Sequence, residues 1–228
     1  MKAAIVAAAG RGLRMGMADG KQYLPLNGIP ILARAVMALE ASPSIEGIII
    51  VVNEADIDRC HRDVVVKYRL GKVLDIVPGG PERQHSVSNG LRKLPKEAEK
   101  VAVHDGARPL VEPALVDACF EAVRDYDGAI AAVPVKDTPK VVTGEVVEKT
   151  LCRDKIWLAQ TPQVFRVEIL REAHRRAERD GFIGTDDASL VERIGGKVKI
   201  VLGSEENIKV TTSVDLLLAE SILKSRPG

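Results

Sequence analysis

The sequence predicts an α/β protein built on an open, mostly parallel, twisted sheet with helices on both faces. Three observations lead to this prediction. Aromatic residues make up only 3% of the chain, so Ala, Val, Ile and Leu are expected to pack the core. Short apolar runs alternate with longer amphipathic segments, which is the order that parallel sheets require. The run at 48–52 is continuous Ile and Val, which is typical of a strand covered on both faces.

The first half of the chain contains five predicted elements in alternating order. An apolar run at 3–8 ends in glycine-rich sequence and predicts the first strand. Pro30 suits the first position of a helix, and the apolar residues after it recur on one helical face. The elements that follow are a strand at 48–52, a helix near 55–67 and a strand at 73–77.

The second half continues the alternation. In chain order it predicts a helix at 86–94, a strand at 100–103, a helix at 113–126, a strand at 129–135, helices at 167–179 and 187–194, a strand at 198–202 and a last helix at about 214–223. Thr212 and Asp215 have the spacing of a capping box, which supports the start of the last helix.

Residues 136–153 interrupt this alternation. Two Val-rich runs, 140–142 and 145–147, flank a Thr-Gly pair and predict a charged β-hairpin. An isolated two-stranded hairpin is marginally stable in water, so this one is expected to pack on something. A flap against its own domain and an arm that clasps a second subunit explain it equally well. We assign residues 1–228 to one domain, with residues 136–153 as an excursion from it.

The charges nearly balance, with 33 Lys and Arg against 32 Asp and Glu. The chain therefore has no field of one sign for broad binding of nucleic acid or an anionic membrane, and a few placed cations must hold any bound anion. Its three cysteines show no CxxC spacing, which disfavours a disulfide framework or a cysteine-based zinc site and fits a reducing cytoplasm. No apolar run approaches the ~18 residues that span a bilayer.

The most informative segment, residues 7–16, is a Gly-rich turn directly after the first strand. Ligands of open α/β sheets bind beyond the carboxyl ends of strands, where small residues let backbone N–H groups approach phosphate oxygens. Two commoner motifs are excluded. A dinucleotide fingerprint needs glycine where Met15 stands and an acidic residue where Asn53 comes closest. A P-loop needs four residues between its glycines, whereas Gly16 and Gly20 are separated by three.

Charged residues elsewhere strengthen the case for a phosphate site. Arg14 and Lys21 lie seven residues apart and could flank one polyphosphate. Asp105 follows a buried strand, where a carboxylate can hold Mg²⁺, although a helix or turn cap is the plainer explanation. His104 is expected to be a core histidine with satisfied hydrogen bonds. Lys209 by itself would be an ordinary surface lysine.

Seven short motifs, weak singly but specific in this order, resemble one known family across nearly the whole chain. They are Ala8-Ala9-Gly10-x-Gly12-x-Arg14-Met15, Lys21-Gln22-Tyr23-Leu24, Gly79-Gly80-x-Glu82-Arg83-x-x-Ser86-Val87, His104-Asp105-x-Ala107-Arg108-Pro109, Thr161-Pro162-Gln163, Thr185-Asp186-x-Ala188-Ser189 and Asn207-Ile208-Lys209-Val210-Thr211. The chain resembles the 2-C-methyl-D-erythritol 4-phosphate cytidylyltransferases. These Rossmann-like nucleotidyltransferases make CDP-methylerythritol from CTP in the non-mevalonate route to isoprenoid precursors.

The resemblance implies roles for individual residues. The positions of Arg14 and Lys21 stabilise the pentacoordinate α-phosphorus, and those of Arg153 and Lys209 position the methylerythritol phosphate. The position of Asp105 lies at the ribose and at the metal, Mg²⁺ or another divalent cation. The remaining positions are those near the acceptor, Ala107, Arg108 and Thr138, and those that hold CTP, Ala8, Ala9, Gly10, Gly12, Gly80 and Ser86.

The resemblance also implies a homodimer, because the family's counterpart of residues 136–153 packs on a second subunit and carries the Arg153 position into the neighbour's site. The absence of a His/Ser/Asp constellation fits this chemistry. A phosphate monoester with a second pKa of about 6 is largely dianionic at pH 7 and needs no general base. An in-line displacement then requires cations and a metal to collect charge.

Three positions depart from the family pattern. Gly20 precedes Lys21 where proline is usual, which predicts a more mobile loop before substrate binds. Pro81 replaces the usual aspartate after the double glycine, which removes a carboxylate and one backbone N–H near the expected base site. Cys152 stands where aspartate is common, so Arg153 has no acidic neighbour on that side.

Two other functions compete with this one. A cytidylyltransferase for another sugar-alcohol phosphate, such as ribitol 5-phosphate, shares the loop, the lysines and the Thr-Pro-Gln motif. A catalytically silent nucleotide-binding homologue would be expected to lose Arg14, Lys21, Asp105 or Lys209, and the chain has all four. Turnover with CTP and a panel of sugar phosphates would separate these alternatives.

Overall fold

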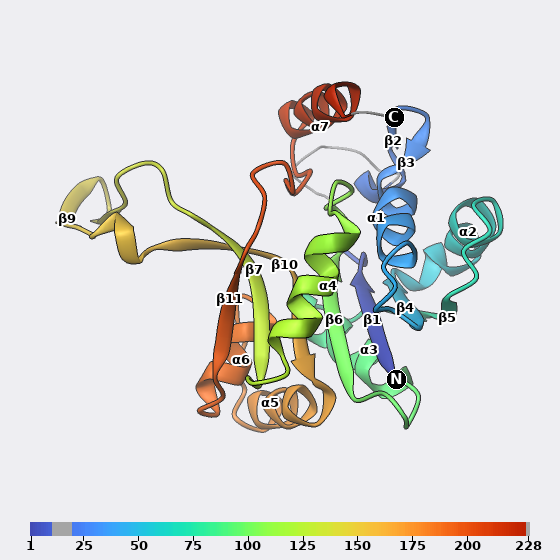
Figure 1. Cartoon of the computed structure of the whole chain (residues 1–228). Coiled ribbons are helices and arrows are strands. Elements are labelled where there is room, and N and C mark those ends of the chain that lie inside the picture. The colour runs from blue at the N-terminus through green and yellow to red at the C-terminus, as the bar shows by residue number, and fades with distance from the viewer. Residues whose placement is uncertain (11–19, 227–228) are drawn as a thin grey trace.

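A seven-stranded sheet organises residues 1–10 and 20–226, which are those that the computed structural model describes (Figure 1). In spatial order its strands are β11 (Val198–Leu202), β7 (Gly128–Pro134), β10 (Trp157–Arg166), β6 (Lys100–Asp105), β1 (Lys2–Ala7), β4 (Gly47–Val52) and β5 (Val73–Pro78). β10 runs antiparallel to both of its neighbours, and the other six described strands run parallel. The predicted open, mostly parallel sheet is confirmed.

Helices cover both faces of this sheet, as predicted. One face packs against α1 (Ile31–Glu40), α2 (Ile57–Cys60) and α4 (Pro113–Ala122), and the other against α3 (Arg83–Lys93), α5 (Val167–Arg179) and α6 (Asp187–Arg193). Successive side chains of a strand point to opposite faces, so Ala4 and Val6 of β1 join the first core and Ala3 and Ile5 the second. This two-sided burial explains why the strand sequences are continuous apolar runs.

The last helix, α7 (Ser213–Ser225), lies apart from both faces (Figure 1). It packs with a short hairpin of β2 (Pro25–Leu26) and β3 (Ile29–Pro30) through a small apolar cluster that includes Leu26, Val210 and Ala219. The predicted capping box is present: the Thr212 hydroxyl accepts from the Asp215 N–H, and the Asp215 carboxylate accepts from the Thr212 N–H. This packing fixes the chain just before α7 above the sheet.

Two stretches differ from the sequence-based expectations. The helix predicted near 55–67 is a 3₁₀ turn (Glu54–Asp56), then α2, then a π-helical segment (His61–Val66). Strand β10 was not predicted, since Pro162 removes a ladder donor and usually argues against a central strand. The register of β10 against β7 shifts between Ala159 and Gln163, and this irregularity accommodates the proline.

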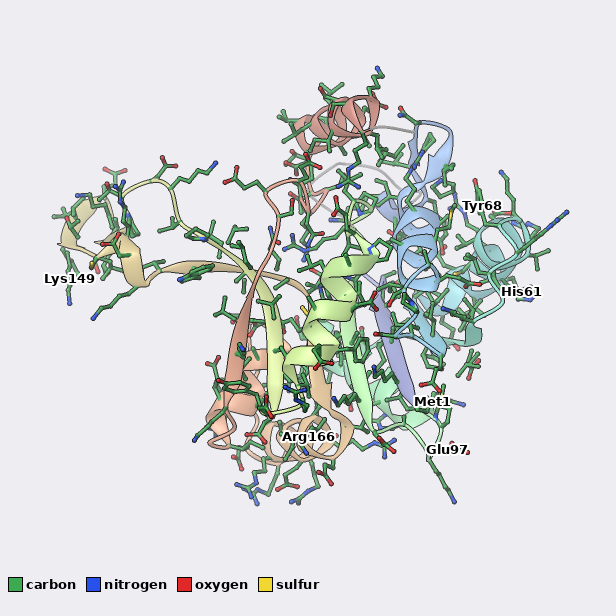
Figure 2. The ribbon with its side chains drawn as sticks, viewed as in Figure 1. Met1, His61, Tyr68, Glu97, Lys149 and Arg166 are labelled. Atoms are coloured by element: carbon green, nitrogen blue, oxygen red, sulfur yellow. The ribbon has the colours of Figure 1, made fainter. Side chains whose placement is uncertain are left out.

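The hairpin at 136–153 forms a separate two-stranded sheet of β8 (Lys140–Thr143) and β9 (Val146–Thr150). It projects sideways from the sheet as an arm, with Lys149 near its end (Figures 1 and 2). Every residue of both strands is exposed, so the arm is not a flap buried against its own domain. None of the helices in the described ranges is long and apolar enough to cross a membrane.

Candidate active site

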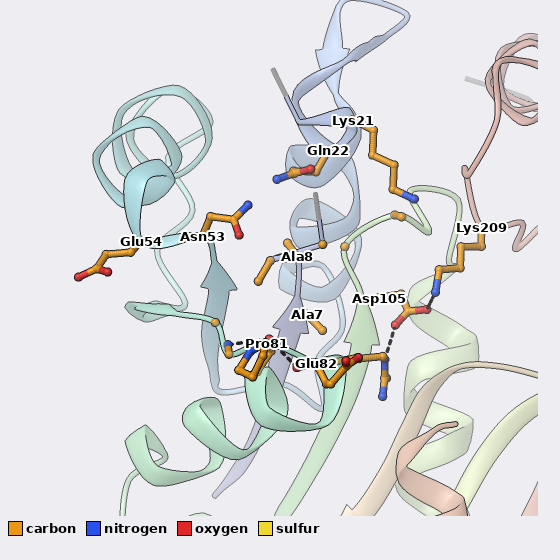
Figure 3. A pocket seen from close by; sticks show the side chains of 18 residues that line it. Ala7, Ala8, Lys21, Gln22, Asn53, Glu54, Pro81, Glu82, Asp105 and Lys209 are labelled. Atoms are coloured by element: carbon orange, nitrogen blue, oxygen red, sulfur yellow. Dashed lines mark hydrogen bonds and ion pairs between the residues drawn. The ribbon is translucent and has the colours of Figure 1, made fainter. Parts of the chain in front are cut away.

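A cleft of about 730 Å³ opens at the carboxyl ends of β1, β4, β5 and β6. Its floor consists of the residues that directly follow these parallel strands, including Ala8, Asn53 and Gly79. Lys21 and Gln22, from the 3₁₀ turn Lys21–Tyr23, line another part of the wall (Figure 3). Open α/β sheets bind their ligands at this edge, so the cleft lies where the fold predicts a site.

The floor is closely packed because small residues let two strand-end loops meet. A Cβ atom added to Gly79 would lie 2.2 Å from the Cβ of Ala9. The Gly80 N–H donates to the Ser86 hydroxyl at 3.1 Å, which ties the loop after β5 to the start of α3. A larger residue at 79 would separate these loops. The double glycine therefore serves the shape of the cleft as well as the approach of a ligand.

Most of the residues proposed from the sequence meet in this cleft. Those that line it are Ala8, Ala9, Gly10, Lys21, Gly80, Ser86, Asp105, Ala107 and Lys209. Gly12 and Arg14 lie outside the described residues. Arg108, Thr138 and Arg153 are described but do not line the cleft of their own chain.

Asp105, the last residue of β6, is the centre of charge in the cleft. Its Oδ1 accepts from Arg83 Nε at 3.0 Å, and its Oδ2 lies 2.7 Å from Lys209 Nζ (Figure 3). Burial by itself raises the pKa of this carboxyl, but the charges of Arg83 and Lys209 outweigh burial and hold the pKa well below its usual range. Asp105 is therefore ionised at any physiological pH, and it is not the plain turn cap that the sequence also allowed.

The two lysines of the cleft come from distant segments. Lys21 Nζ donates to the carbonyl oxygen of Val210 at 3.2 Å, which draws the 3₁₀ turn towards the chain just before α7. Lys209 is next to this anchor in sequence and reaches across to Asp105 (Figure 3). The packing of the chain around α7 thus brings both ammonium groups to one cleft. Neither residue is an ordinary surface lysine.

His104 is a core histidine, as expected. It is fully buried, and burial lowers its pKa to about 4, so the ring is neutral. Its Nε2 lies 3.1 Å from the carbonyl oxygen of Arg108, which can only accept, so Nε2 carries the proton. Its Nδ1 then accepts from the Thr161 hydroxyl at 3.1 Å. Both ring nitrogens are used, and the ring faces the core instead of the cleft.

The three acceptor-side residues that do not line the cleft have different surroundings. Arg108 is turned inwards, where its Nη1 donates to the Asn207 carbonyl at 2.6 Å and its Nε lies 4.0 Å from Asp105 Oδ2. Thr138 is exposed at the base of the arm. Arg153 is also exposed and donates to the Lys136 carbonyl at 3.4 Å. In this single chain, Thr138 and Arg153 belong to the arm and not to the cleft wall.

Comparison with known proteins identifies the chain. The sequence profile of the 2-C-methyl-D-erythritol 4-phosphate cytidylyltransferase family matches residues 2–225. The chain belongs to this family. It is 49% identical to the enzyme of that name from Geotalea uraniireducens, over 97% of this chain and 96% of the relative. It is 46% identical to that from Geobacter metallireducens, over 98% and 97%.

Solved structures of the cytidylyltransferase family share the whole fold. The 4-diphosphocytidyl-2C-methyl-D-erythritol synthase of Anaerococcus prevotii superposes with a TM-score of 0.87 at 31% identity, covering 98% of this chain and 96% of that one. The cytidylyltransferase of Francisella tularensis gives 0.82 at 32% identity, covering 96% and 98%. The similarity therefore extends over nearly the whole chain.

The structure explains one departure from the cytidylyltransferase pattern. Gly20 has a φ of 67°, in the left-handed region that glycine adopts readily. A proline ring fixes φ near −65°, so proline could not take this conformation. A second departure, Pro81, lines the cleft and offers no N–H to a ligand there. The third, Cys152, is exposed and unpaired.

Two further residues of the cytidylyltransferase motifs line the cleft without having been assigned a role. Gln22 is only 3% exposed, and within the described part of the chain neither its Nε2 nor its Oε1 has a hydrogen-bond partner. Arg83 bridges Asp105 and Asp187. Both could have been proposed as site residues from the sequence, because each stands inside one of the seven family motifs. Their contacts could not be foreseen, because the partners are far away in the sequence.

The donor set around Asp105 fits a magnesium ion that the nucleotide helps to hold. Within the described ranges, no group of three or more His, Cys, Asp or Glu side chains could hold a metal ion unaided. Mg²⁺ commonly takes one or two carboxylates and fills its remaining positions with water and substrate phosphates. The ionised Asp105 carboxylate at the wall of this open cleft meets the first part of that requirement.

Proposed function

We propose that the cleft beside Asp105 is where this chain carries out the reaction of its family. The cytidylyl group of CTP passes to 2-C-methyl-D-erythritol 4-phosphate, which gives CDP-methylerythritol and pyrophosphate for isoprenoid precursors. The observation that carries the placement is the cluster of Asp105, Lys21 and Lys209 at the carboxyl ends of parallel strands. The small residues Ala8, Ala9 and Gly10 leave room there for a triphosphate.

In the proposed mechanism, a phosphate oxygen of the acceptor attacks the α-phosphorus of CTP. A new P–O bond forms as the bond from the α-phosphorus to the α–β bridging oxygen breaks, and pyrophosphate leaves with the electron pair. No proton has to be removed from the dianionic nucleophile. Lys21, together with Arg14, stabilises the charge on the α-phosphoryl oxygens, and Lys209 binds the acceptor phosphate.

Mg²⁺ would supply positive charge to the triphosphate oxygens, and Asp105 is the residue that would hold it. In the ligand-free chain, Lys209 neutralises Oδ2 of this carboxylate at 2.7 Å. With Asp105 holding the metal ion, the Lys209 ammonium group would be available to bind the acceptor phosphate. The Asp105–Lys209 pair thus holds both side chains in place in the cleft.

We predict that Asp105→Asn lowers the turnover number by about 100-fold, equivalent to roughly 3 kcal/mol of lost transition-state stabilisation. The amide would leave Arg83 and Lys209 without their shared carboxylate and would remove the anionic metal ligand. The measurement is the initial rate as a function of Mg²⁺ concentration, with chelator excess as the zero point. Full activity in excess chelator would exclude a metal, and a wild-type Mg²⁺ profile for the variant would reduce Asp105 to a structural role.

Asp117→Asn is the matched control for this variant. Asp117 is also partly buried and hydrogen-bonded, with Oδ1 accepting from the Ser42 hydroxyl at 2.6 Å, but it lies outside the cleft. Its substitution should alter thermal stability and leave the Mg²⁺ profile unchanged. A loss of rate in both variants would point to general destabilisation.

Gln22 is proposed to contact the nucleotide. Its buried amide carries a donor and an acceptor that find no partner among the described residues, and an unsatisfied buried polar group costs free energy. We predict that Gln22→Met raises the free energy of unfolding by about 1 kcal/mol and weakens CTP binding about fivefold. Thermal unfolding and calorimetric titration with CTP measure the two effects.

Gln84→Met provides the matched comparison for Gln22→Met. Gln84 is equally buried but satisfied, because its Nε2 donates to the Phe182 carbonyl at 3.0 Å and its Oε1 accepts from the Gly184 N–H at 2.9 Å. This variant should lose stability and keep its affinity for CTP. Unchanged CTP affinity in Gln22→Met would remove Gln22 from the nucleotide site.

A homodimer is proposed as the working form. Val142, Val146 and Val147 of the arm expose 49%, 70% and 55% of their surface, an arrangement that favours burial against a second copy. Arg153 and Thr138 would then reach the partner's cleft, since neither lines its own. We also place the protein in the cytoplasm, where its three unpaired cysteines would stay reduced.

The reaction itself is tested by turnover of radiolabelled CTP with a panel of acceptors. We expect CDP-methylerythritol and pyrophosphate from the methylerythritol phosphate, at a kcat/KM well above that for ribitol 5-phosphate. A preference for ribitol 5-phosphate would mean that the same cleft uses another alditol phosphate as its acceptor. CTP binding without turnover on any acceptor would favour a silent homologue.

A further inference from the structure

A series of polar contacts, here called the ladder, runs from His174 and Asp187 in the interior of the protein through Arg83 and Asp105 to Lys209 at the cleft. Asp187 Oδ1 lies 3.1 Å from His174 Nε2, and Asp187 Oδ2 accepts from Arg83 Nη1 at 2.6 Å. Arg83 Nε donates in turn to Asp105 Oδ1 at 3.0 Å, and the ladder ends where Asp105 Oδ2 meets Lys209. Each inner member is held at two points, so none can turn without breaking a contact.

The two inner residues that line the cleft are more exposed than the two that do not. The side chains of Arg83 and Asp105 are 27% and 10% exposed and both line the cleft. Those of Asp187 and His174 are 1% and 5% exposed and do not line it. Asp187 and His174 therefore cannot touch a substrate in the cleft, and any effect they have on the reaction must pass through Arg83.

The position of Arg83 is electrostatically unfavourable for its own helix. Arg83 is the first residue of α3, where the helix dipole favours acidic side chains over basic ones. Two carboxylates from other elements offset this: Asp105 at the end of β6 and Asp187 at the start of α6. The planar guanidinium can bridge both at a fixed angle, which a lysine ammonium could not do.

We infer that Arg83, held by Asp187 and His174, is a positioning residue that fixes the orientation of the Asp105 carboxylate. It occupies Oδ1 and so leaves Oδ2 as the oxygen that faces Lys209 and the incoming ligand. This inference rests on the proposed function of the cleft and adds three residues to it. The alternative is that the ladder only stabilises the fold. In that case kcat of the folded protein would not depend on Asp187.

Asp187→Asn and Arg83→Lys test the inference, with Asp180→Asn as the matched control. Asp180 forms an exposed ion pair with Arg193 at 2.9 Å, and neither residue lines the cleft. The measurements are kcat, the CTP dissociation constant from calorimetry, the melting temperature and the crystal structure of each variant. We expect kcat to fall roughly 10- to 100-fold in both ladder variants, with a much smaller change in CTP affinity.

The crystal structure of Asp187→Asn should show the Asp105 carboxylate rotated and its contact with Arg83 Nε lost. The Arg83→Lys/Asp187→Asn double variant should be no slower than Arg83→Lys alone, because both act through one path. If Asp187→Asn does not fold, His174→Leu probes the same path, and His174→Gln, which keeps a donor for Asp187, should restore the rate.

Three results would overturn the inference. Wild-type kcat in folded Asp187→Asn, with only a lower melting temperature, would make the ladder structural. A large loss of kcat in Arg83→Lys together with a wild-type kcat in Asp187→Asn would show that Arg83 touches substrate directly. An unrotated Asp105 carboxylate in the Asp187→Asn crystal structure would contradict the positioning role of Arg83. This structural result does not depend on turnover, so it is distinguishable from a failure of the proposed function, in which the wild-type protein would turn over no CTP.

Discussion

Lys21→Ala should lower kcat by roughly 100- to 1,000-fold while it changes the affinity for CTP little. The expected loss is about 3–4 kcal/mol, the typical effect of removing one donor that meets charge growing in the transition state. The structure gives the reason for a selective effect: Lys21 lines the cleft and is held towards it by the Val210 carbonyl at 3.2 Å. Single-turnover rates and calorimetric CTP binding separate the two quantities.

Lys72→Ala is the control for this experiment. Lys72 is also partly buried and donates to a backbone carbonyl, that of Ser42 at 2.8 Å, but it lies away from the cleft. The Lys72→Ala substitution should lower the free energy of unfolding and leave kcat unchanged. Equal losses of CTP affinity and turnover in Lys21→Ala would instead make Lys21 a simple phosphate anchor. The same comparison applies to Arg14→Ala, whose position lies outside the described residues.

Mixing two inactive variants should restore activity if Arg153 works in the neighbouring subunit. Arg153→Ala and Lys21→Ala are each expected to be nearly inactive. In a mixed dimer, one site would carry both changes and the other neither. Random exchange makes half of the dimers mixed, so activity should return towards half of the value expected if every dimer had one intact site. The placement of Arg153 on the projecting arm, outside its own cleft, favours this outcome.

Subunit exchange has to be measured separately in this experiment, by co-purification of two differently tagged variants. With exchange demonstrated, continued inactivity would mean that Arg153 serves its own chain, because every site would then keep one change. Sedimentation of the wild-type protein as a monomer would contradict the proposed homodimer directly. Recovery would locate the arm across the interface and would support Thr138 as a second contact from the partner.

Much of the fold was predictable because its signals are local. The Ile and Val run of β4 indicates burial on both faces, and the Thr212 and Asp215 spacing indicates a capping box, each from a few neighbouring residues. The Gly-rich turn after β1 and the ordered motifs likewise pointed to the cleft and to the family. β10 was missed because Pro162 removes a backbone donor, and only a register shift against β7 makes that tolerable in a central strand.

The sequence by itself determined the alternation of strands and helices and the family, and it supplied the residues proposed for phosphate chemistry. Only the tertiary structure decided which of them meet. Arg83 and Asp187 are separated by 104 positions, yet they form one ion pair because α3 and α6 both begin near the end of β6. Hydrophobic periodicity specifies which face of an element is buried, but it does not specify the partner of a charged side chain. That partner is set by the strand order and by helix packing, which bring the carboxyl ends of parallel strands to one edge.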